Sequence, residues 1–341
     1  MDDLTLLKTK LETFLNKIKS DYTIHAPVKV GDLVYFKKID KPSDITLDFY
    51  NSKVPPKSVI FKQTETMFKF KQGLDAEIQP LNEKTRKNVI FGIRPCDAKS
   101  MSILDNVFQD DFTDPYYVNK RKNTVLVGVS CKQPTINCFC TSMDGGPADS
   151  KHLDVLFSDI GNRYYVEIKN NKGKNLIDGA RNLFEKATND DKRKRLQLEK
   201  KSKDEISRNM KTEGIPEKLD KIFDDDIWKN ISLRCLGCGI CTYECPTCHC
   251  FDIQDETTLS DGARIRVWDT CMNPEYTVHA SGHNPRPTRM NRIRNRVYHK
   301  FNYFPKNYNL IACVGCGRCI NDCPVNIDII EIIDKAREVK T

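Results

Sequence analysis

The sequence of 341 residues lacks the segments that usually mark a secreted or membrane-bound chain. Its first twenty residues, MDDLTLLKTKLETFLNKIKS, are charged and are typical of an amphipathic helix. No apolar run approaches the length that a membrane-spanning helix needs. We therefore expect a soluble, cytoplasmic protein with no membrane partner.

Motifs for nucleotide binding and for serine hydrolysis are also missing. No G-x-G-x-x-G follows a strand-like run, and neither G-x-x-x-x-G-K-[ST] nor G-x-S-x-G occurs. The chain is thus expected to bind no nucleotide itself. Any flavin or nicotinamide chemistry would belong to another subunit.

Acidic residues are scarce in one segment, which accounts for nearly all of the net charge of +8. Residues 264–306 include nine Lys or Arg but only two acidic residues. Aromatic residues accompany this segment, but no nucleic-acid-binding module does, so we expect no nucleic-acid partner. We predict that some arginines of this segment face bound iron–sulfur clusters and that others contact an acidic partner. The alternative is a solvated basic loop. The arginines concerned are Arg286, Arg289, Arg292, Arg294 and Arg296.

The pattern of apolar residues predicts an α+β protein. Residues 1–175 form a mixed α/β domain with strand-like runs in the order LVYF, SVIF, MFKFK, NVIFGI, TVLVGV and YYVEIK. Residues 176–230 are rich in Lys, Asp, Glu and Arg and are expected to be a charged helical connector. Residues 231–341 follow as a helix-rich ferredoxin-type domain.

Cysteine is abundant, with fifteen residues in the chain. Because the cytosol keeps thiols reduced, closely spaced cysteines there indicate metal ligation more than disulfides. The pattern C-x2-C-x2-C-x3-C-P occurs twice without a mismatch and predicts two 4Fe-4S clusters. The two ligand sets are Cys235, Cys238, Cys241 and Cys245 before Pro246, and Cys313, Cys316, Cys319 and Cys323 before Pro324.

The fourth cysteine of such a motif normally reaches the other cluster, so we expect crossed ligation. The 67 residues between Cys245 and Cys313 exceed what a compact dicluster ferredoxin needs, which favours the helical kind of module. A pair of zinc sites is the alternative. It does not explain the third and fourth cysteines or the proline of each motif.

Three further cysteines in the same region exceed what the two motifs use: Cys248, Cys250 and Cys271. With His249, His279 or His283 they form either an additional ligand site or ordinary packing against the clusters. The sequence leaves both alternatives open.

The N-terminal half contains the remaining four cysteines, Cys96, Cys131, Cys138 and Cys140. They follow NVIFGI and TVLVGV, which are typical of buried parallel strands, so both loops should leave the carboxyl ends of neighbouring strands. We predict a third iron–sulfur cluster there, held by Cys131, Cys138 and Cys140 with either Cys96 or Asp97. The alternative is that these cysteines have no redox role.

The short sequence motifs around the cysteines resemble those of one protein family along nearly the whole chain. They are RPCD at 94–97, CFC at 138–140, CLGCGICTYECPTCHC at 235–250, ASGH at 280–283 and CVGCGRCINDCP at 313–324. The family contains the 4Fe-4S dicluster subunit of anaerobic sulfite reductase and the beta subunit of cytosolic sulfhydrogenases. HAPVKV, PPKSVIFK and GHNPRPTRMNRIRNR look more like the hydrogenase subunits.

The resemblance implies an electron-transfer subunit of an oxidoreductase complex in an anaerobic cell. An FAD-containing, NAD(P)H-oxidising subunit of the ferredoxin-reductase type would dock on it, and a catalytic subunit would lie beyond. That subunit would be a nickel–iron hydrogenase or, alternatively, a sulfite reductase. A stand-alone reductase with its reaction at the N-terminal cysteines is a third, less favoured hypothesis.

Overall fold

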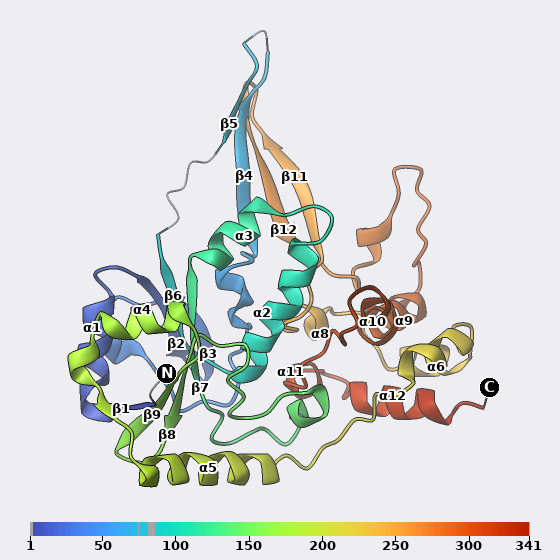
Figure 1. Cartoon of the computed structure of the whole chain (residues 1–341). Helices are drawn as coiled ribbons and strands as arrows, with labels where there is room; N and C mark the ends of the chain where they lie inside the picture. The colour runs from blue at the N-terminus through green and yellow to red at the C-terminus, as the bar shows by residue number, and fades with distance from the viewer. Residues whose placement is uncertain (1–2, 74, 81–85, 341) are drawn as a thin grey trace.

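A mixed sheet of eight strands forms the centre of the N-terminal half within residues 3–73, 75–80 and 86–340, which the computed structural model describes (Figure 1). Its order is β10-β1-β9-β8-β7-β6-β2-β3, with parallel pairing from β2 through β6 and β7 to β8. The strands are β1 Leu4–Leu7, β2 Thr23–Val30, β3 Leu33–Lys38, β6 Asn88–Ile93, β7 Thr124–Val129, β8 Val155–Asp159, β9 Arg163–Ile168 and β10 Glu185–Lys186.

Helices cover both faces of this sheet and build most of the C-terminal half. The helices of the N-terminal half are α1 Leu11–Ile18, α2 Pro95–Phe108, α3 Pro115–Lys122 and α4 Asn171–Asp178. Those that follow are α5 Asn189–Asp204, α6 Ile215–Lys221, α7 Ile227–Ser232, α8 Ile240–Tyr243, α9 Arg289–Tyr298, a π-helix at His299–Tyr303, α10 Phe304–Tyr308, α11 Arg318–Asn321 and α12 Ile329–Glu338. No helix of the described residues has both the length and the apolar character needed to span a bilayer. The α+β class predicted from the sequence is confirmed.

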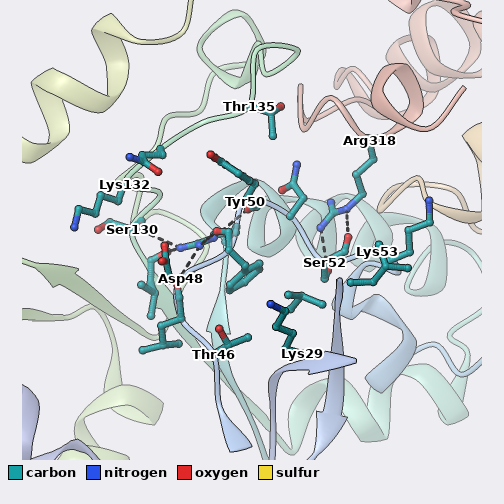
Figure 2. Close-up of a pocket in the computed structure, with 18 of the residues that line it drawn as sticks. Lys29, Thr46, Asp48, Tyr50, Ser52, Lys53, Ser130, Lys132, Thr135 and Arg318 are labelled. Carbon is teal, nitrogen blue, oxygen red and sulfur yellow. Dashed lines mark hydrogen bonds between the residues drawn. The ribbon is translucent and has the colours of Figure 1, made fainter. Parts of the chain in front are cut away.

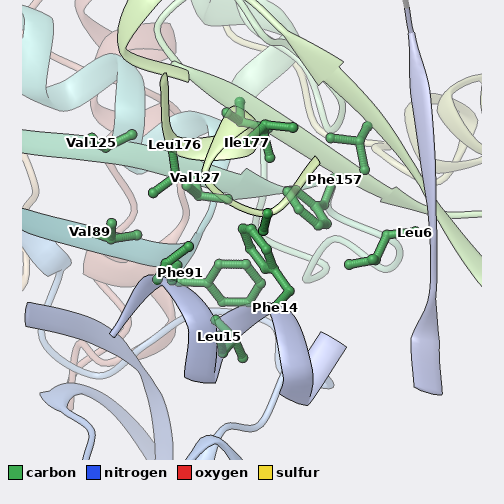
Figure 3. Close-up of a cluster of buried hydrophobic side chains, with 14 of the residues drawn as sticks. Leu6, Phe14, Leu15, Val89, Phe91, Val125, Val127, Phe157, Leu176 and Ile177 are labelled. Carbon is green, nitrogen blue, oxygen red and sulfur yellow. The ribbon is translucent and has the colours of Figure 1, made fainter. Parts of the chain in front are cut away.

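The two faces of the central sheet pack against different helices. On one face Phe14 of α1 and Ile177 of α4 meet strand residues such as Phe91 and Phe157 (Figure 3). On the other face Met101 and Leu104 of α2 belong to a core with alternate residues of the same strands. The inner strands are therefore apolar on both faces, which explains the continuous apolar runs of β6 and β7.

A second sheet joins distant parts of the chain. It has the order β11-β12-β4-β5, and all its pairs are antiparallel. Its strands are β4 Thr64–Lys71, β5 Glu77–Pro80, β11 Phe251–Thr257 and β12 Asp261–Trp268. The connection between the two cysteine motifs thus contains a β-hairpin, which was not predicted from the sequence, in addition to helices.

Two local predictions were wrong. The SVIF run is not a strand, because Pro55 and Pro56 lead into a 3-10 helix at Pro56–Val59. Proline fixes φ near −65° and removes a backbone donor, which disfavours a strand at this point. The predicted helix over the first twenty residues begins only at Leu11, and residues Leu4–Leu7 form the edge strand β1. Met1 and Asp2 lie outside the described residues.

The strands that position the cysteines were predicted correctly. NVIFGI is β6 and TVLVGV is β7, and the two are parallel neighbours. Their carboxyl ends lie at one edge of the sheet, where α2 and the loop from residue 130 begin. The helical C-terminal half packs against this edge around a core that includes Trp228, Tyr298, Phe301 and Ile333.

Candidate metal centre

Thiols from both ferredoxin-type motifs surround one cavity, which we call the first cavity. Its walls include Cys235, Cys238 and Cys241 of the first motif and Cys323 of the second. Backbone N–H groups point at two of these sulfurs: Gly237 N lies 3.3 Å from Cys235 Sγ, and Ile327 N lies 3.2 Å from Cys323 Sγ. Such N–H···S contacts stabilise thiolates that bind metal.

The second cavity has the reciprocal arrangement. Its walls include Cys313, Cys316 and Cys319 of the second motif and Cys245 of the first. The fourth cysteine of each motif thus lies with the first three of the other. This grouping of the cysteines is the one that crossed ligation of two 4Fe-4S clusters predicts.

The third cavity lies at the carboxyl edge of the central sheet. Its walls include the four N-terminal cysteines, Cys96, Cys131, Cys138 and Cys140. Cys96 lies in the first turn of α2, where helical N–H groups favour negative charge. Burial raises the pKa of Cys96 well above its usual value and that of Cys140 to about 12, so these thiols stay protonated until a metal displaces the proton.

Asp97 is engaged elsewhere. Its two carboxylate oxygens accept hydrogen bonds of 2.6 and 2.8 Å from the guanidinium of Arg318, and both side chains are buried. Asp97 is not among the residues that line the third cavity, whereas Cys96 is. Of the two predicted alternatives for a fourth ligand, this geometry favours Cys96.

The three cavities form a continuous row. Cys319 lines both the first and the second cavity, and Cys316 lines both the second and the third. The loop of Cys138 and Cys140 packs directly on the second motif, since Phe139 N donates to Gly315 O at 2.9 Å. A Cβ atom on Gly315 would lie 2.5 Å from the Phe139 backbone, so only glycine permits this approach.

Buried positive charge surrounds the cavities. Arg94 beside the third cavity is 4 % exposed, and its hydrogen bonds go to backbone carbonyls, including Ser130 O at 3.1 Å. Arg296 is 5 % exposed and lines both the first and the second cavity, and its Nε has no hydrogen-bond partner among the described residues. Burying a charge without a counter-ion is costly. A cluster with four thiolates is anionic, so the residues present fit such a group.

The surroundings of Cys245 lower the pKa of its thiol. The Cys248 thiol donates a hydrogen bond to it, and this bond lowers the pKa of Cys245 well below its usual value even though burial acts in the opposite direction. The nearby cations of Lys300, Lys57 and Arg296 lower it further. Cys245 is therefore predisposed to be a thiolate, the form that binds metal.

The surplus cysteines and histidines line none of these three cavities. Cys248 lies beside Cys245, and Cys271 donates a hydrogen bond to Cys250 that lowers the pKa of Cys250 to about 6. His249 packs against His299, while His279 and His283 form an edge-to-face contact at the surface. Among the described residues no three Cys, His, Asp or Glu side chains are close enough to hold a single metal ion.

The arginines of the basic segment have different surroundings, and the predicted contact of some of them with an acidic partner stays a prediction. Arg296 faces the cavities, and Arg289 donates to Cys235 O at 2.7 Å. Arg292 is also buried, but it donates to the carbonyls of residues 286 and 287. Arg294 stacks on Phe223 with 3.6 Å between the guanidinium and the ring centroid. None of these contacts identifies a partner protein.

A polar cleft of about 820 Å³ adjoins the third cavity (Figure 2). Tyr50, Asn51, Arg94 and Thr135 line both spaces. Segment 46–53 lies between them and is held by two buried arginines: Arg94 bonds the carbonyl of Tyr50, and Arg318 donates to Ser52 O at 2.9 Å. The cleft thus lies against the same residues that form one wall of the third cavity.

Sequence reasoning missed the cations from the N-terminal half. Arg94 lines the third cavity and Lys57 bonds the carbonyl of Cys245, both from segments whose local pattern is that of an ordinary loop or helix start. For Arg94 the only signal was its place beside Cys96, directly after a buried strand. Lys57 gave no local signal.

Comparisons with known proteins find similarity over both ferredoxin-type motifs and over the chain as a whole. Residues 234–327 match the family model of the 4Fe-4S dicluster domain. Over 326 residues the chain is 32% identical to sulfhydrogenase 2 subunit beta of Pyrococcus furiosus. The alignment covers 95% of this chain and 95% of that protein, so the similarity includes the N-terminal half as well as the two motifs.

Proposed function

Because the chain belongs to the family of sulfhydrogenase beta subunits, we propose that it relays electrons between the catalytic subunit of a cytoplasmic nickel–iron hydrogenase and an FAD-containing, NAD(P)H-oxidising subunit. The similarity and the dicluster domain support the more general role of an iron–sulfur electron-transfer subunit in a hydrogenase-type complex.

The observation that supports this proposal most is the row of three thiol-lined cavities. Neighbouring cavities share Cys319 or Cys316 in their walls, so groups bound in them would be close neighbours. A bound 4Fe-4S cluster supplies reversible one-electron chemistry. The protein would supply the thiolates and balance the negative charge with the buried side chains of Arg94, Arg296 and Lys300.

The ligand sets that we propose follow the cavity walls. Cys235, Cys238, Cys241 and Cys323 would hold one cluster, and Cys245, Cys313, Cys316 and Cys319 a second. Cys96, Cys131, Cys138 and Cys140 would hold a third. We assign Cys248, Cys250 and Cys271 to packing beside the ligands, since none of them lines these cavities.

Anaerobic purification of the tagged chain from its own cell tests the proposal. We expect about twelve irons per chain, a copurifying flavoprotein and a nickel-containing subunit. Zinc in place of iron would refute the cluster assignment. A copurifying sirohaem protein would instead support the sulfite reductase alternative, and turnover by the isolated chain would indicate an autonomous reductase.

A further inference from the structure

The first and second cavities differ in the buried cations that surround them. Arg296 is common to both. Lys300 lines the second cavity only, and the rest of the first cavity is lined mainly by apolar side chains such as Leu236, Ile240 and Met272. The difference in buried positive charge between the two cavities therefore comes from Lys300 and the residues beside it.

Lys300 contacts a ligand sulfur directly. Its side chain is 4 % exposed, and Nζ lies 3.1 Å from Cys245 Sγ, 2.9 Å from Thr247 Oγ1 and 2.9 Å from Ala312 O. No carboxylate is among these partners. The residue lies in the π-helix His299–Tyr303, a rare local geometry that is frequent at functional sites.

A second buried lysine approaches Cys245 from the other half of the chain. Lys57 is 2 % exposed, and its Nζ donates to Cys245 O at 2.8 Å and also to Cys248 O. Its ammonium lies 4.4 Å from the ring centroid of Trp268, which holds it by a cation–π contact. Two ammonium groups from distant segments thus meet at one cysteine.

Positive charge near an iron–sulfur cluster favours its reduced form, because reduction adds negative charge. An N–H donor on a ligand sulfur has the same effect. The first cavity has such donors in Gly237 N and Ile327 N, but each is a backbone dipole without net charge, so its effect should be smaller than that of the Lys300 ammonium. Solvent also stabilises the reduced form, and Cys238 of the first cavity is exposed. A buried ammonium at hydrogen-bond distance is screened far less than charge near water, so its effect should be the larger one.

We propose that Lys300, supported by Lys57, makes the second cavity the site of higher reduction potential within the ferredoxin-type pair. An electron shared by the pair would then reside mainly in the second cavity, the one that adjoins the third. This inference rests on the proposed function, since it requires a cluster in each cavity.

The test is a redox titration of the anaerobically purified full-length holoprotein, followed by electron paramagnetic resonance. Iron and sulfide analysis comes first, so that a chain without clusters would count against the proposed function and not against this inference. Cys238→Ser and Cys313→Ser assign the signals to the first and second cavities. We expect the second cavity's signal to have the higher midpoint potential.

Lys300→Met should shift the second signal to lower potential and move the first signal less. Lys300→Arg should keep the wild-type order, and Lys335→Met on the exposed face of α12 should change neither signal. An equal shift of both signals, or no shift, would overturn the proposal. If Lys300→Met loses iron, Lys57→Met must lower the same signal, and its failure to do so would also overturn the proposal.

Discussion

Arg318 and Asp97 form a fully buried, two-bond ion pair between the second cysteine motif and the helix that begins beside Cys96. Arg318 lies between Cys316 and Cys319, and Asp97 directly follows Cys96. The pair fixes the second and third cavities relative to each other. Removal of one partner would leave an uncompensated charge in the interior.

The first prediction concerns that ion pair. Arg318→Met should lower the free energy of unfolding by about 3–5 kcal/mol, the cost typical of breaking a buried pair. Denaturant titration of the anaerobic protein measures it. Arg264→Met is a matched control, because Arg264 pairs with Asp255 on the surface, where ion pairs contribute little. Equal stability of the two variants would contradict the structural role of Arg318.

The second prediction concerns the third cavity. Cys138→Ser should remove about four irons and leave the two ferredoxin-type signals intact, because Cys138 lines only that cavity. Cys250→Ser is the control and should retain all iron. If Cys138→Ser also keeps its full iron content, the N-terminal cysteines are not cluster ligands.

The third prediction concerns crossed ligation. Cys323→Ser should weaken the same signal as Cys238→Ser, since both line the first cavity, although they belong to different motifs. Cys245→Ser should instead group with Cys313→Ser. Spectra of the four variants test this. Grouping by motif in place of cavity would refute the crossed assignment.

The fourth prediction concerns pH. Burial, with Lys38 and Lys62 nearby and Asn88 opposing them, lowers the pKa of His25 from 6.5 to about 4. Between these values the unfolded chain binds a proton that the folded chain does not, so stability should decrease as pH falls from 6.5 toward 4, by about 3 kcal/mol.

Denaturant titrations at several pH values, on the wild type and on His25→Gln, measure this contribution. The variant should lose part of the acid-induced decrease in stability. His279→Gln, at an exposed position, should behave like the wild type. Identical pH dependence in all three proteins would show that His25 is not responsible.

The sequence predicted the parts of the site that are encoded locally. Cysteine spacing is a local property, and so are the apolar runs of β6 and β7 that precede Cys96 and Cys131. Because parallel neighbours end at the same edge, the meeting of the four N-terminal cysteines could be inferred from strand type alone.

Other features depend on partners far away in the chain. Asp97 could not be distinguished from a ligand, because Arg318 lies 221 residues later. The hairpin of β11 and β12 was missed although FDIQ and ARIRV alternate, because β11 is mostly exposed and β12 has its second partner, β4, almost 200 residues earlier in the chain. Lys57 had no local signal, because its contacts with Cys245 and Cys248 span about 190 residues.

The pairing of β4 with β12 means that the proposed divisions at 1–175, 176–230 and 231–341 need not be units that can be produced separately. A fragment beginning at residue 231 would present the edge of β12 without its partner strand, with Arg266 deprived of Glu65 at 2.7 Å and of Asp114. Unpaired strand edges promote aggregation. The fragment would also lack Lys57 at Cys245. We therefore expect the separately produced ferredoxin-type segment to be insoluble. Coexpression with residues 1–230 should yield soluble protein, because it restores these contacts.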